Sequence, residues 1–319
     1  MSVIIPQEDS AQEHDQDQKT LAHSGYVAVI GRPNVGKSTL MNRILGEKIA
    51  IVSPKPQTTR LRQLGIYTQD NIQVIFVDTP GIHQPGHKLG EFMVEVALEA
   101  LRDADVILFV LDLSQRPTAE DKRVAALLSQ AQSGAPIVLA LNKLDRLSPD
   151  KVLSSVEAYR ALVPDATDWT PLSATLGNGV DDLLKRVIER LPAGPLFFPE
   201  DQLSDTAMRD IAAEIIREKV LLNTEQEIPH AVAVELEEYK ERSDTLTYIS
   251  ANIYVERDSQ KGILIGKNGA MLKKISSEAR VDLEKLTDTQ VYLELWVKVL
   301  KNWRQDDALL RRLGYRLSK

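Results

Sequence analysis

The segment from Gly31 to Ser38, Gly-Arg-Pro-Asn-Val-Gly-Lys-Ser, is typical of a loop that binds phosphate groups. Successive backbone N–H groups in such a loop surround a phosphate, and glycines at Gly31 and Gly36 let the backbone approach it closely. The Lys37 ammonium would lie between the β- and γ-phosphates of a nucleotide, and the Ser38 hydroxyl would bind Mg²⁺. The candidate phosphate-binding residues are Gly31, Asn34, Val35, Gly36, Lys37, Ser38 and Thr39.

A second motif, Asn-Lys-Leu-Asp at residues 142–145, favours guanine over adenine. The Asp145 carboxylate can accept hydrogen bonds from the N1–H and N2–H groups of guanine, whereas the N1 lone pair of adenine would repel it. A polar site of this kind rejects the wrong base by roughly 10⁴-fold. We expect Asn142 to brace the phosphate loop and the Lys143 stem to cover one face of the base. The candidate guanine-binding residues are Asn142, Lys143, Asp145, Ser173 and Ala174; the last two belong to the segment 173–175, which could offer a backbone N–H to the guanine O6.

Two segments between these motifs could respond to the γ-phosphate. A buried strand is predicted over residues 72–77, and it leads directly into Asp78, which would hold Mg²⁺ through water. The Gly81 N–H could bond the γ-phosphate, so loss of that phosphate would release the segment. In the polar loop 56–60, Thr59, or else Thr58, would complete the metal shell; a solvated loop would have a similar sequence. The candidate switch residues are Thr58, Thr59, Asp78, Thr79, Pro80, Gly81 and Ile82, and the candidate metal-binding residues are Ser38, Thr59 and Asp78.

With these motifs in this order, residues 26–191 resemble a translation-factor-class GTPase domain of the Era/TrmE/Der type. Ras-like GTPases carry, after the glycine equivalent to Gly81, a glutamine that orients the attacking water. Here that position is Ile82, which can neither orient water nor accept a proton. The resemblance implies that Asn34 recruits a potassium ion, the alternative being that Asn34 only stiffens its loop. It also implies slow hydrolysis of GTP to GDP without assistance.

The elements that position these motifs alternate between strand and helix, in the order of a doubly wound parallel sheet. Every motif follows a predicted strand, which is where ligands bind in such sheets. The alternation stops at residues 191–199, where three prolines and a glycine cannot continue a helix. The predicted division is an acidic disordered extension over 1–24, a GTPase domain over 25–192, a linker over 193–203 and a second domain over 204–319.

The second domain is predicted to be α+β. The predicted order is a helix with an N-cap at Ser204-Asp205, strands over 231–236 and 246–255 with polar residues 238–244 between them, a helix ending at Gly266, another helix, and a strand over 291–297. Helix, two strands, helix, GxxG, helix, strand is the order of a type II KH domain.

The GxxG pattern at residues 266–269 is informative because it lies between the apolar end of one predicted helix and the basic start of the next. In KH domains this loop lets the RNA backbone approach main-chain N–H groups, while four nucleotides lie in the adjoining groove. Lysines would face the phosphates, and residues 263–265 would partly line the groove; the alternative is a solvated helix face. The candidate RNA-binding residues are Ile265, Gly266, Lys267, Asn268, Gly269, Lys273 and Lys274.

Aromatic residues near the C-terminal end allow two interpretations. Trp296, Trp303 and Tyr315 could stack on bases, but aromatic residues on a terminal strand and helix more often fill the core. We therefore expect a packing role for them.

The composition of the 319-residue chain limits the classes of function. The formal net charge of −7 argues against nucleic-acid binding, but from Arg257 onward basic residues outnumber acidic ones. The absence of cysteine excludes disulfides, thiolate zinc sites and thiol nucleophiles. The longest apolar runs fall far short of the roughly 20 residues that a membrane span requires. We expect a soluble, cytoplasmic protein.

Taken together, the two domains resemble the bacterial Era GTPase family across nearly the whole chain after residue 24. The resemblance implies a Mg²⁺-dependent GTP/GDP switch whose KH domain binds the 3′ end of small-subunit (16S) ribosomal RNA and assists assembly of the 30S subunit. It also implies peripheral association with the inner face of the plasma membrane, and we expect a monomer. The alternative is a GTPase that signals through protein partners, with the KH-like domain as a docking module.

Overall fold

The computed structural model describes residues 22–55, 57–131 and 133–316. The acidic extension predicted over 1–24 lies outside the described residues up to residue 21. Its last residues enter the first strand, which begins at His23. Within the described part of the chain, no helix is both long and apolar enough to cross a membrane.

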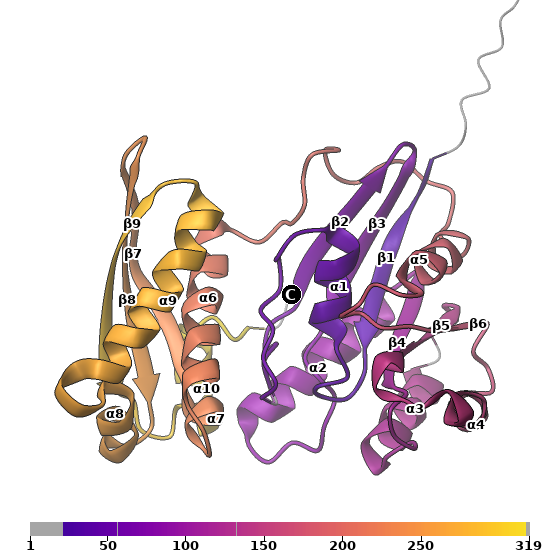
Figure 1. The fold of residues 1–319 in the computed structure, drawn as a ribbon, viewed down its shortest axis with the longest axis horizontal. Helices are drawn as coiled ribbons and strands as arrows, with labels where there is room; N and C mark the ends of the chain where they lie inside the picture. The colour runs from indigo at the N-terminus through magenta and orange to yellow at the C-terminus, as the bar shows by residue number, and fades with distance from the viewer. Residues whose placement is uncertain (1–21, 56, 132, 317–319) are drawn as a thin grey trace, which may run out of the picture.

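The first domain contains a six-stranded sheet (Figure 1). Its strands are β1 (His23–Ile30), β2 (Gln63–Gln69), β3 (Ile72–Asp78), β4 (Val106–Asp112), β5 (Ile137–Asn142) and β6 (Asp168–Pro171). The order across the sheet is β2-β3-β1-β4-β5-β6, and only β2 is antiparallel to its neighbour. The helices are α1 (Lys37–Leu45), α2 (Lys88–Arg102), α3 (Ala119–Ala131), α4 (Pro149–Leu162) and α5 (Val180–Ile188), with a short 3-10 helix, η1 (Leu144–Arg146).

Helices cover both faces of this sheet, because successive residues of a strand point to opposite sides. In β1, Ala28 and Ile30 pack in the core that α2, α3 and α4 close. Val27 and Val29 pack in the core beneath α1 and α5. The doubly wound α/β arrangement is therefore confirmed, with the motif-bearing loops at the carboxyl ends of the parallel strands.

The second domain is the predicted α+β unit. Its elements are α6 (Met208–Asn223), α7 (Ile228–Ala231), β7 (Ala233–Ser243), β8 (Leu246–Val255), α8 (Asp258–Ile265), η2 (Lys267–Gly269), α9 (Ala270–Thr287), β9 (Gln290–Val299), η3 (Trp303–Gln305) and α10 (Asp307–Arg312). The sheet order is β7-β8-β9, with β7 antiparallel and β9 parallel to β8. Helices α6 and α9 close one apolar core with this sheet. The element order of a type II KH domain is confirmed.

Two local predictions in this domain are wrong. Ser204 does not cap α6, which begins at Met208 after Ala207; its hydroxyl donates instead to the Leu64 carbonyl, 2.7 Å away. Most of the polar stretch 238–244 belongs to β7 rather than to a loop. Because β7 is an edge strand, its charged side chains can point into solvent without breaking the backbone ladder.

The linker runs along the first domain. The Ile66 N–H donates to the Leu203 carbonyl at 2.8 Å, beside β2. The side-chain oxygen of Gln73 accepts hydrogen bonds from the N–H groups of Phe197 and Phe198, at 2.7 and 2.9 Å. Figure 1 shows the second domain beside the first, with α6 on the side that faces the first domain. The linker is thus held at several points rather than free.

Candidate functional site

The phosphate loop between β1 and α1 needs both of its glycines. Gly31 and Gly36 have φ angles of +152° and +101°. A Cβ on Gly31 would lie 2.4 Å from the Val110 carbonyl oxygen, and one on Gly36 would lie 2.3 Å from the amide nitrogen of Asn142. Any residue with a side chain at these positions would collide with the neighbouring atoms and displace the loop.

Lys37, the first residue of α1, folds back over the loop. Its Nζ donates to the carbonyls of Gly31 and Arg32, each at 3.3 Å. Burial lowers the pKa of Lys37 from 10.5 to about 8, which the Asp78 carboxylate partly opposes. A bound phosphate would place a negative charge beside this buried ammonium group and so stabilise its protonated form.

Three side chains from separate segments meet beside the loop. The Ser38 hydroxyl lies 2.6 Å from Asp78 Oδ2, and Thr59 Oγ1 lies 3.1 Å from Ser38 Oγ and 3.2 Å from Asp78 Oδ2. Burial raises the pKa of Asp78, against the charge of Lys37 and the hydroxyl hydrogen bonds. Asp78 Oδ1 is buried and has no hydrogen-bond partner among the described residues. Two hydroxyls and a carboxylate with a spare oxygen fit a hard cation such as Mg²⁺ and its water ligands.

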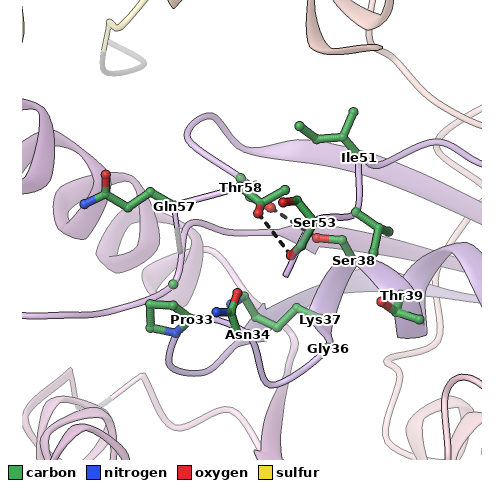
Figure 2. Close-up of a pocket in the computed structure, with 13 residues that line it drawn as sticks. Pro33, Asn34, Gly36, Lys37, Ser38, Thr39, Ile51, Ser53, Gln57 and Thr58 are labelled. Atoms are coloured by element: carbon green, nitrogen blue, oxygen red, sulfur yellow. Dashed lines mark hydrogen bonds between the residues drawn. The ribbon is translucent and has the colours of Figure 1, made fainter. Parts of the chain in front are cut away.

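The loop between α1 and β2 forms the opposite wall of the pocket (Figure 2). The Thr58 hydroxyl is used within its own loop, where Oγ1 donates to the Lys55 carbonyl at 2.7 Å. Thr59 points inward and is buried. Of the two threonines considered as metal ligands, the geometry favours Thr59.

The segment after β3 lies directly against the phosphate loop. A Cβ on Gly81 would come within 2.7 Å of the Pro33 nitrogen, and the Ile82 N–H donates to the Gly31 carbonyl at 3.2 Å. Thr79 donates its hydroxyl hydrogen bond to the Val29 carbonyl. The Ile82 side chain is buried in the core of the GTPase domain, so it does not reach the position of an attacking water.

Asn142 joins three of the motifs. Its amide nitrogen donates to the Val35 carbonyl at 2.8 Å, and its amide oxygen accepts from the Ala174 N–H at 2.9 Å. The Ser173 N–H donates to the Asn178 carbonyl. Two of the three main-chain donors in the segment 173–175, those of Ser173 and Ala174, are therefore already used within the protein. The Asp145 side chain is 22% exposed, so a bound base would complete the burial of its carboxylate.

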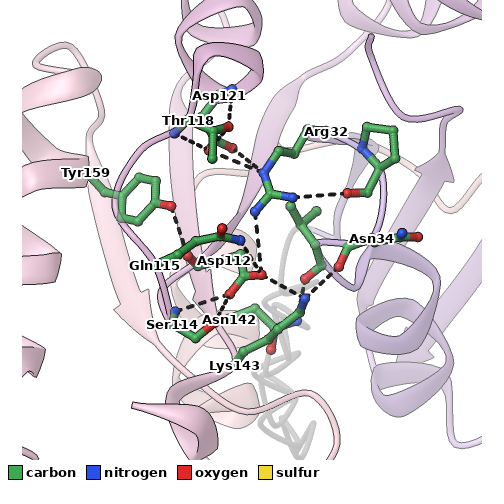
Figure 3. Close-up of polar contacts among 12 residues, drawn as sticks. Arg32, Asn34, Asp112, Ser114, Gln115, Thr118, Asp121, Asn142, Lys143 and Tyr159 are labelled. Atoms are coloured by element: carbon green, nitrogen blue, oxygen red, sulfur yellow. Dashed lines mark hydrogen bonds and ion pairs between the residues drawn. The ribbon is translucent and has the colours of Figure 1, made fainter. Parts of the chain in front are cut away.

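A buried ionic cluster beside these motifs was not predicted from the sequence (Figure 3). The Arg32 guanidinium lies 3.2 Å from Asp121 and 3.5 Å from Asp112. Asp112 Oδ2 also accepts from Lys143 Nζ at 2.8 Å, and the same ammonium donates to the Asn34 carbonyl. Partial burial opposes ionisation of Asp112, but hydrogen bonds led by that from Lys143 lower its pKa overall. The cluster ties the phosphate loop to the guanine motif through the end of β4.

Sequence patterns could not reveal this cluster, because its members are far apart in the chain and belong to no common motif. Arg32 is a variable position inside the phosphate-loop pattern, and Asp121 lies in the first turn of α3. The only signal available was that a carboxylate ends β4, Asp112, as another one, Asp78, ends β3.

The GxxG loop joins α8 to α9. Gly266 and Gly269 have φ angles of +71° and +78°, and Asn268 between them is also left-handed, at +51°. Lys267 and Lys273, the latter one turn into α9, are exposed and have no ion pair within the described residues, whereas the exposed Lys274 lies 3.9 Å from Glu278. This leaves a narrow basic surface next to backbone N–H groups.

The apolar residues before this loop only partly match the prediction. Leu264 is fully buried in the KH core, so the expectation that it lines a groove for bases is wrong. Ile263 is exposed and Ile265 is half-buried. The helical period of α8 explains the difference, because one residue in each turn must face the core.

The C-terminal aromatic residues divide into two groups. Trp303 and Tyr315 are buried and stack with ring centroids 5.8 Å apart, and the Trp303 Nε1–H donates to the Ala231 carbonyl. The packing role expected for these two is confirmed. Trp296, with 58% of its surface exposed on β9, does not fill the core as we expected.

Comparisons with known proteins agree with this geometry. A family model described as "50S ribosome-binding GTPase" matches residues 26–143, and one described as "KH domain" matches residues 227–304. The chain is 51% identical over 296 residues to the "GTPase Era" of Ruminiclostridium cellulolyticum, covering 93% of this chain and 98% of that protein. It is 52% identical to the "GTPase Era" of Geobacter metallireducens, covering 92% of this chain and 97% of that protein.

Two solved structures match both domains together. One is Era in complex with MgGDPNP and nucleotides 1506–1542 of 16S ribosomal RNA, with a TM-score of 0.89 and 40% identity; 93% of this chain and 100% of that chain are covered. The other is a point variant of Aquifex aeolicus Era bound to GDP·AlF4⁻, with a TM-score of 0.88 and 40% identity; 92% of this chain and 100% of that chain are covered.

Proposed function

The chain belongs to the Era family of GTPases, and from this premise we propose a GTP-controlled switch that binds the 3′ end of 16S ribosomal RNA through its KH domain and assists assembly of the small ribosomal subunit. The protein is a GTPase with a C-terminal KH domain. One observation carries the RNA part of the proposal: the chain matches, across both domains, a solved Era that holds a GTP analogue and 16S nucleotides together.

We assign the residues of the phosphate site as follows. Lys37 neutralises the phosphates, and Ser38, Thr59 and Asp78 hold Mg²⁺, Asp78 through water. Mg²⁺ supplies positive charge against the charge that develops on the β- and γ-phosphate oxygens. Asn142 fixes the spacing between the phosphate loop and the base, and Asp145 reads the guanine edge. Because Ile82 faces the core, no side chain at that position orients water, which fits slow intrinsic hydrolysis.

We propose that a potassium ion at Asn34 assists hydrolysis. Asn34 is exposed at the pocket, and its amide nitrogen donates to the Pro54 carbonyl at 2.9 Å, so the amide oxygen remains as a ligand for a cation. GTP hydrolysis should be several-fold faster in potassium than in sodium, and Asn34→Ala should remove that difference. Equal rates in the two salts would reject the potassium site.

RNA binding is tested with an oligonucleotide that matches the 16S 3′ end. Its affinity should be higher with a non-hydrolysable GTP analogue bound than with GDP bound. Lys267→Glu should weaken binding and make the dependence on salt less steep, because one phosphate contact is lost. Lys151→Glu, at an exposed position of α4 in the other domain, is the matched control and should bind as the unaltered protein does.

Weak RNA binding that changes neither with the bound nucleotide nor in Lys267→Glu would favour the alternative, in which the KH domain docks a protein partner.

We further propose that the protein is a cytoplasmic monomer that touches the inner face of the plasma membrane only peripherally. Analytical ultracentrifugation and co-sedimentation with anionic lipid vesicles test the oligomeric state and the membrane contact separately.

A further inference from the structure

The loop between α1 and β2, residues 46–62, carries the candidate metal ligand Thr59 but contains no helix or strand of its own among its described residues. Its position must therefore come from what it contacts. One side of it faces the phosphate site, and the other faces the KH domain, whose helix α6 contacts the loop through polar side chains.

Glu218 of α6 holds the first part of this loop. Its carboxylate accepts a hydrogen bond from the Val52 N–H at 2.9 Å and lies 2.6 Å from Lys48 Nζ. Ile51, between these two residues, is buried in the apolar core of the KH domain rather than in that of its own domain. The loop is thus part of the KH core at this point.

Arg217, the preceding residue of α6, holds the second part. Its guanidinium is 1% exposed and donates to the Thr58 carbonyl, and at 3.5 Å to the Gln57 carbonyl. Glu214 pairs with the same guanidinium at 2.5 Å. Gln57 has a φ angle of +62°, so these hydrogen bonds hold a backbone turn that a residue with a side chain seldom adopts.

Arg60 fixes the chain on the other side of Thr59. Its guanidinium is buried in the KH domain, where it donates to the carbonyls of Val232 at 2.6 Å and Pro229 at 3.1 Å. It also lies over the Trp303 ring, 5.6 Å from the centroid. Both sequence neighbours of Thr59 are therefore bound by the KH domain, while Thr59 itself contacts Ser38 and Asp78.

We propose that Arg217 is a positioning residue for the GTPase reaction: from the KH domain it holds the Thr58 carbonyl, and so places the Thr59 hydroxyl at the metal. The inference rests on the proposed role of Thr59 as a metal ligand. Small displacements of a positioned group have large effects on rate, so a shift of α6 would weaken the metal shell. Because coupling is reciprocal, metal and γ-phosphate that draw Thr59 inward would favour this placement of α6.

The test compares Arg217→Gln with Arg209→Gln. Arg209 lies on the same helix and also donates to a carbonyl, that of Leu236, but inside the KH domain. For Arg217→Gln we expect affinity for a non-hydrolysable GTP analogue to fall at least about fivefold, the low end of typical coupling. The Mg²⁺ concentration for half-maximal hydrolysis should rise, and GDP affinity should stay unchanged. Arg209→Gln should change none of these.

Removing Arg217 alone leaves Glu214 without its partner, so the double variant Arg217→Met, Glu214→Gln is measured beside it. This pair removes both charges and keeps the volume filled. Unchanged selectivity for the GTP analogue over GDP in either folded variant would overturn the proposal. An equal fall in affinity for both nucleotides leaves this selectivity unchanged, so it also overturns the proposal and indicates a structural role. RNA affinity in the GTP-analogue state should fall toward the GDP-state value; absence of RNA binding in the unaltered protein counts only against the RNA function.

Discussion

At the phosphate site two buried groups of opposite charge are both shifted towards their neutral forms. Burial lowers the pKa of Lys37 and raises that of Asp78. Each charge is only partly compensated by the other, and Lys37 is left to donate to backbone carbonyls. Keeping both groups charged is therefore electrostatically costly, and a phosphate with a divalent cation would relieve both of them.

This predicts proton uptake when nucleotide binds at alkaline pH. With a pKa of about 8 in the free protein, Lys37 is mostly protonated at pH 7 and mostly neutral at pH 9. A bound phosphate favours the ammonium form, so GDP binding at pH 9 should take up close to one proton, and at pH 7 very little. The last ionisation of the phosphate, near pH 6, is complete at pH 9 and does not contribute.

Calorimetric titration of GDP in two buffers of different ionisation enthalpy measures this uptake. The affinity for GDP should also fall by up to about tenfold between pH 7 and pH 9, since one unit of pKa corresponds to a factor of ten. Binding without proton uptake at pH 9 would mean that Lys37 is already charged in the free protein.

At the scale of elements, the motif-bearing strands were the easiest to predict. Strands β3 and β4 are buried on both faces, so each contains an apolar run, residues 74–77 and 106–111, that ends at a carboxylate. Edge and connecting segments lack this constraint. The polar end of β7 has the composition of a loop, and Ser204 has the type of an N-cap although its hydroxyl bonds β2 instead. In both cases the observed structure depends on contacts between segments that are distant in sequence, and a local sequence pattern carries no information about such contacts.

The GxxG loop offers a matched test of backbone strain. Gly266 has a φ angle of +71°, and a Cβ there would lie 2.8 Å from Met271 Cβ and 2.9 Å from the Met271 nitrogen. Gly266→Ala should therefore destabilise the KH domain by about 1–3 kcal/mol. Gly262 lies in α8, and a Cβ there would meet no atom within 4 Å. Gly262→Ala should instead stabilise the domain by up to about 1 kcal/mol, from helix propensity.

Urea titration followed by tryptophan fluorescence measures both changes, because two of the three tryptophans, Trp296 and Trp303, lie in the C-terminal half of the chain. If Gly266→Ala were as stable as the unaltered protein, the left-handed conformation at this loop would not be required. RNA affinity should fall for Gly266→Ala and not for Gly262→Ala, since only the first displaces the loop.

At the scale of the whole molecule, the C-terminal segment fastens one domain to the other. Trp303, Leu310 and Tyr315 form an apolar cluster with Leu89 and Met93 of α2, the helix that follows the candidate switch residues 78–82. Lys88, at the start of α2, pairs with Asp307 of α10. The KH domain thus contacts the helix after the candidate switch residues 78–82 and, through α6, the loop that holds the candidate switch residues 58–59. The sequence could not indicate this, because nothing in the pattern of either domain specifies the partner of its exposed face.

Trp303 should therefore be needed for the arrangement of the domains and not for the folding of either. The KH core is built from residues of α6, α9 and the sheet and does not include Trp303. Trp303→Ala removes a fully buried ring, which costs about 3–5 kcal/mol of stabilising free energy. It also removes the ring over which the Arg60 guanidinium lies. Small-angle X-ray scattering should show a larger radius of gyration, with the circular dichroism spectrum unchanged.

Trp296→Ala is the control for this experiment. It removes the same side chain from the same domain, at a position that is 58% exposed on β9, so the scattering curve should not change. The linker should become more sensitive to protease in Trp303→Ala alone, because a KH domain that moves more freely would pull on the hydrogen bond between Leu203 of the linker and Ile66 of β2. Identical scattering from the two variants would show that the interface is held by the polar contacts of α6, with the aromatic cluster merely filling space between the domains.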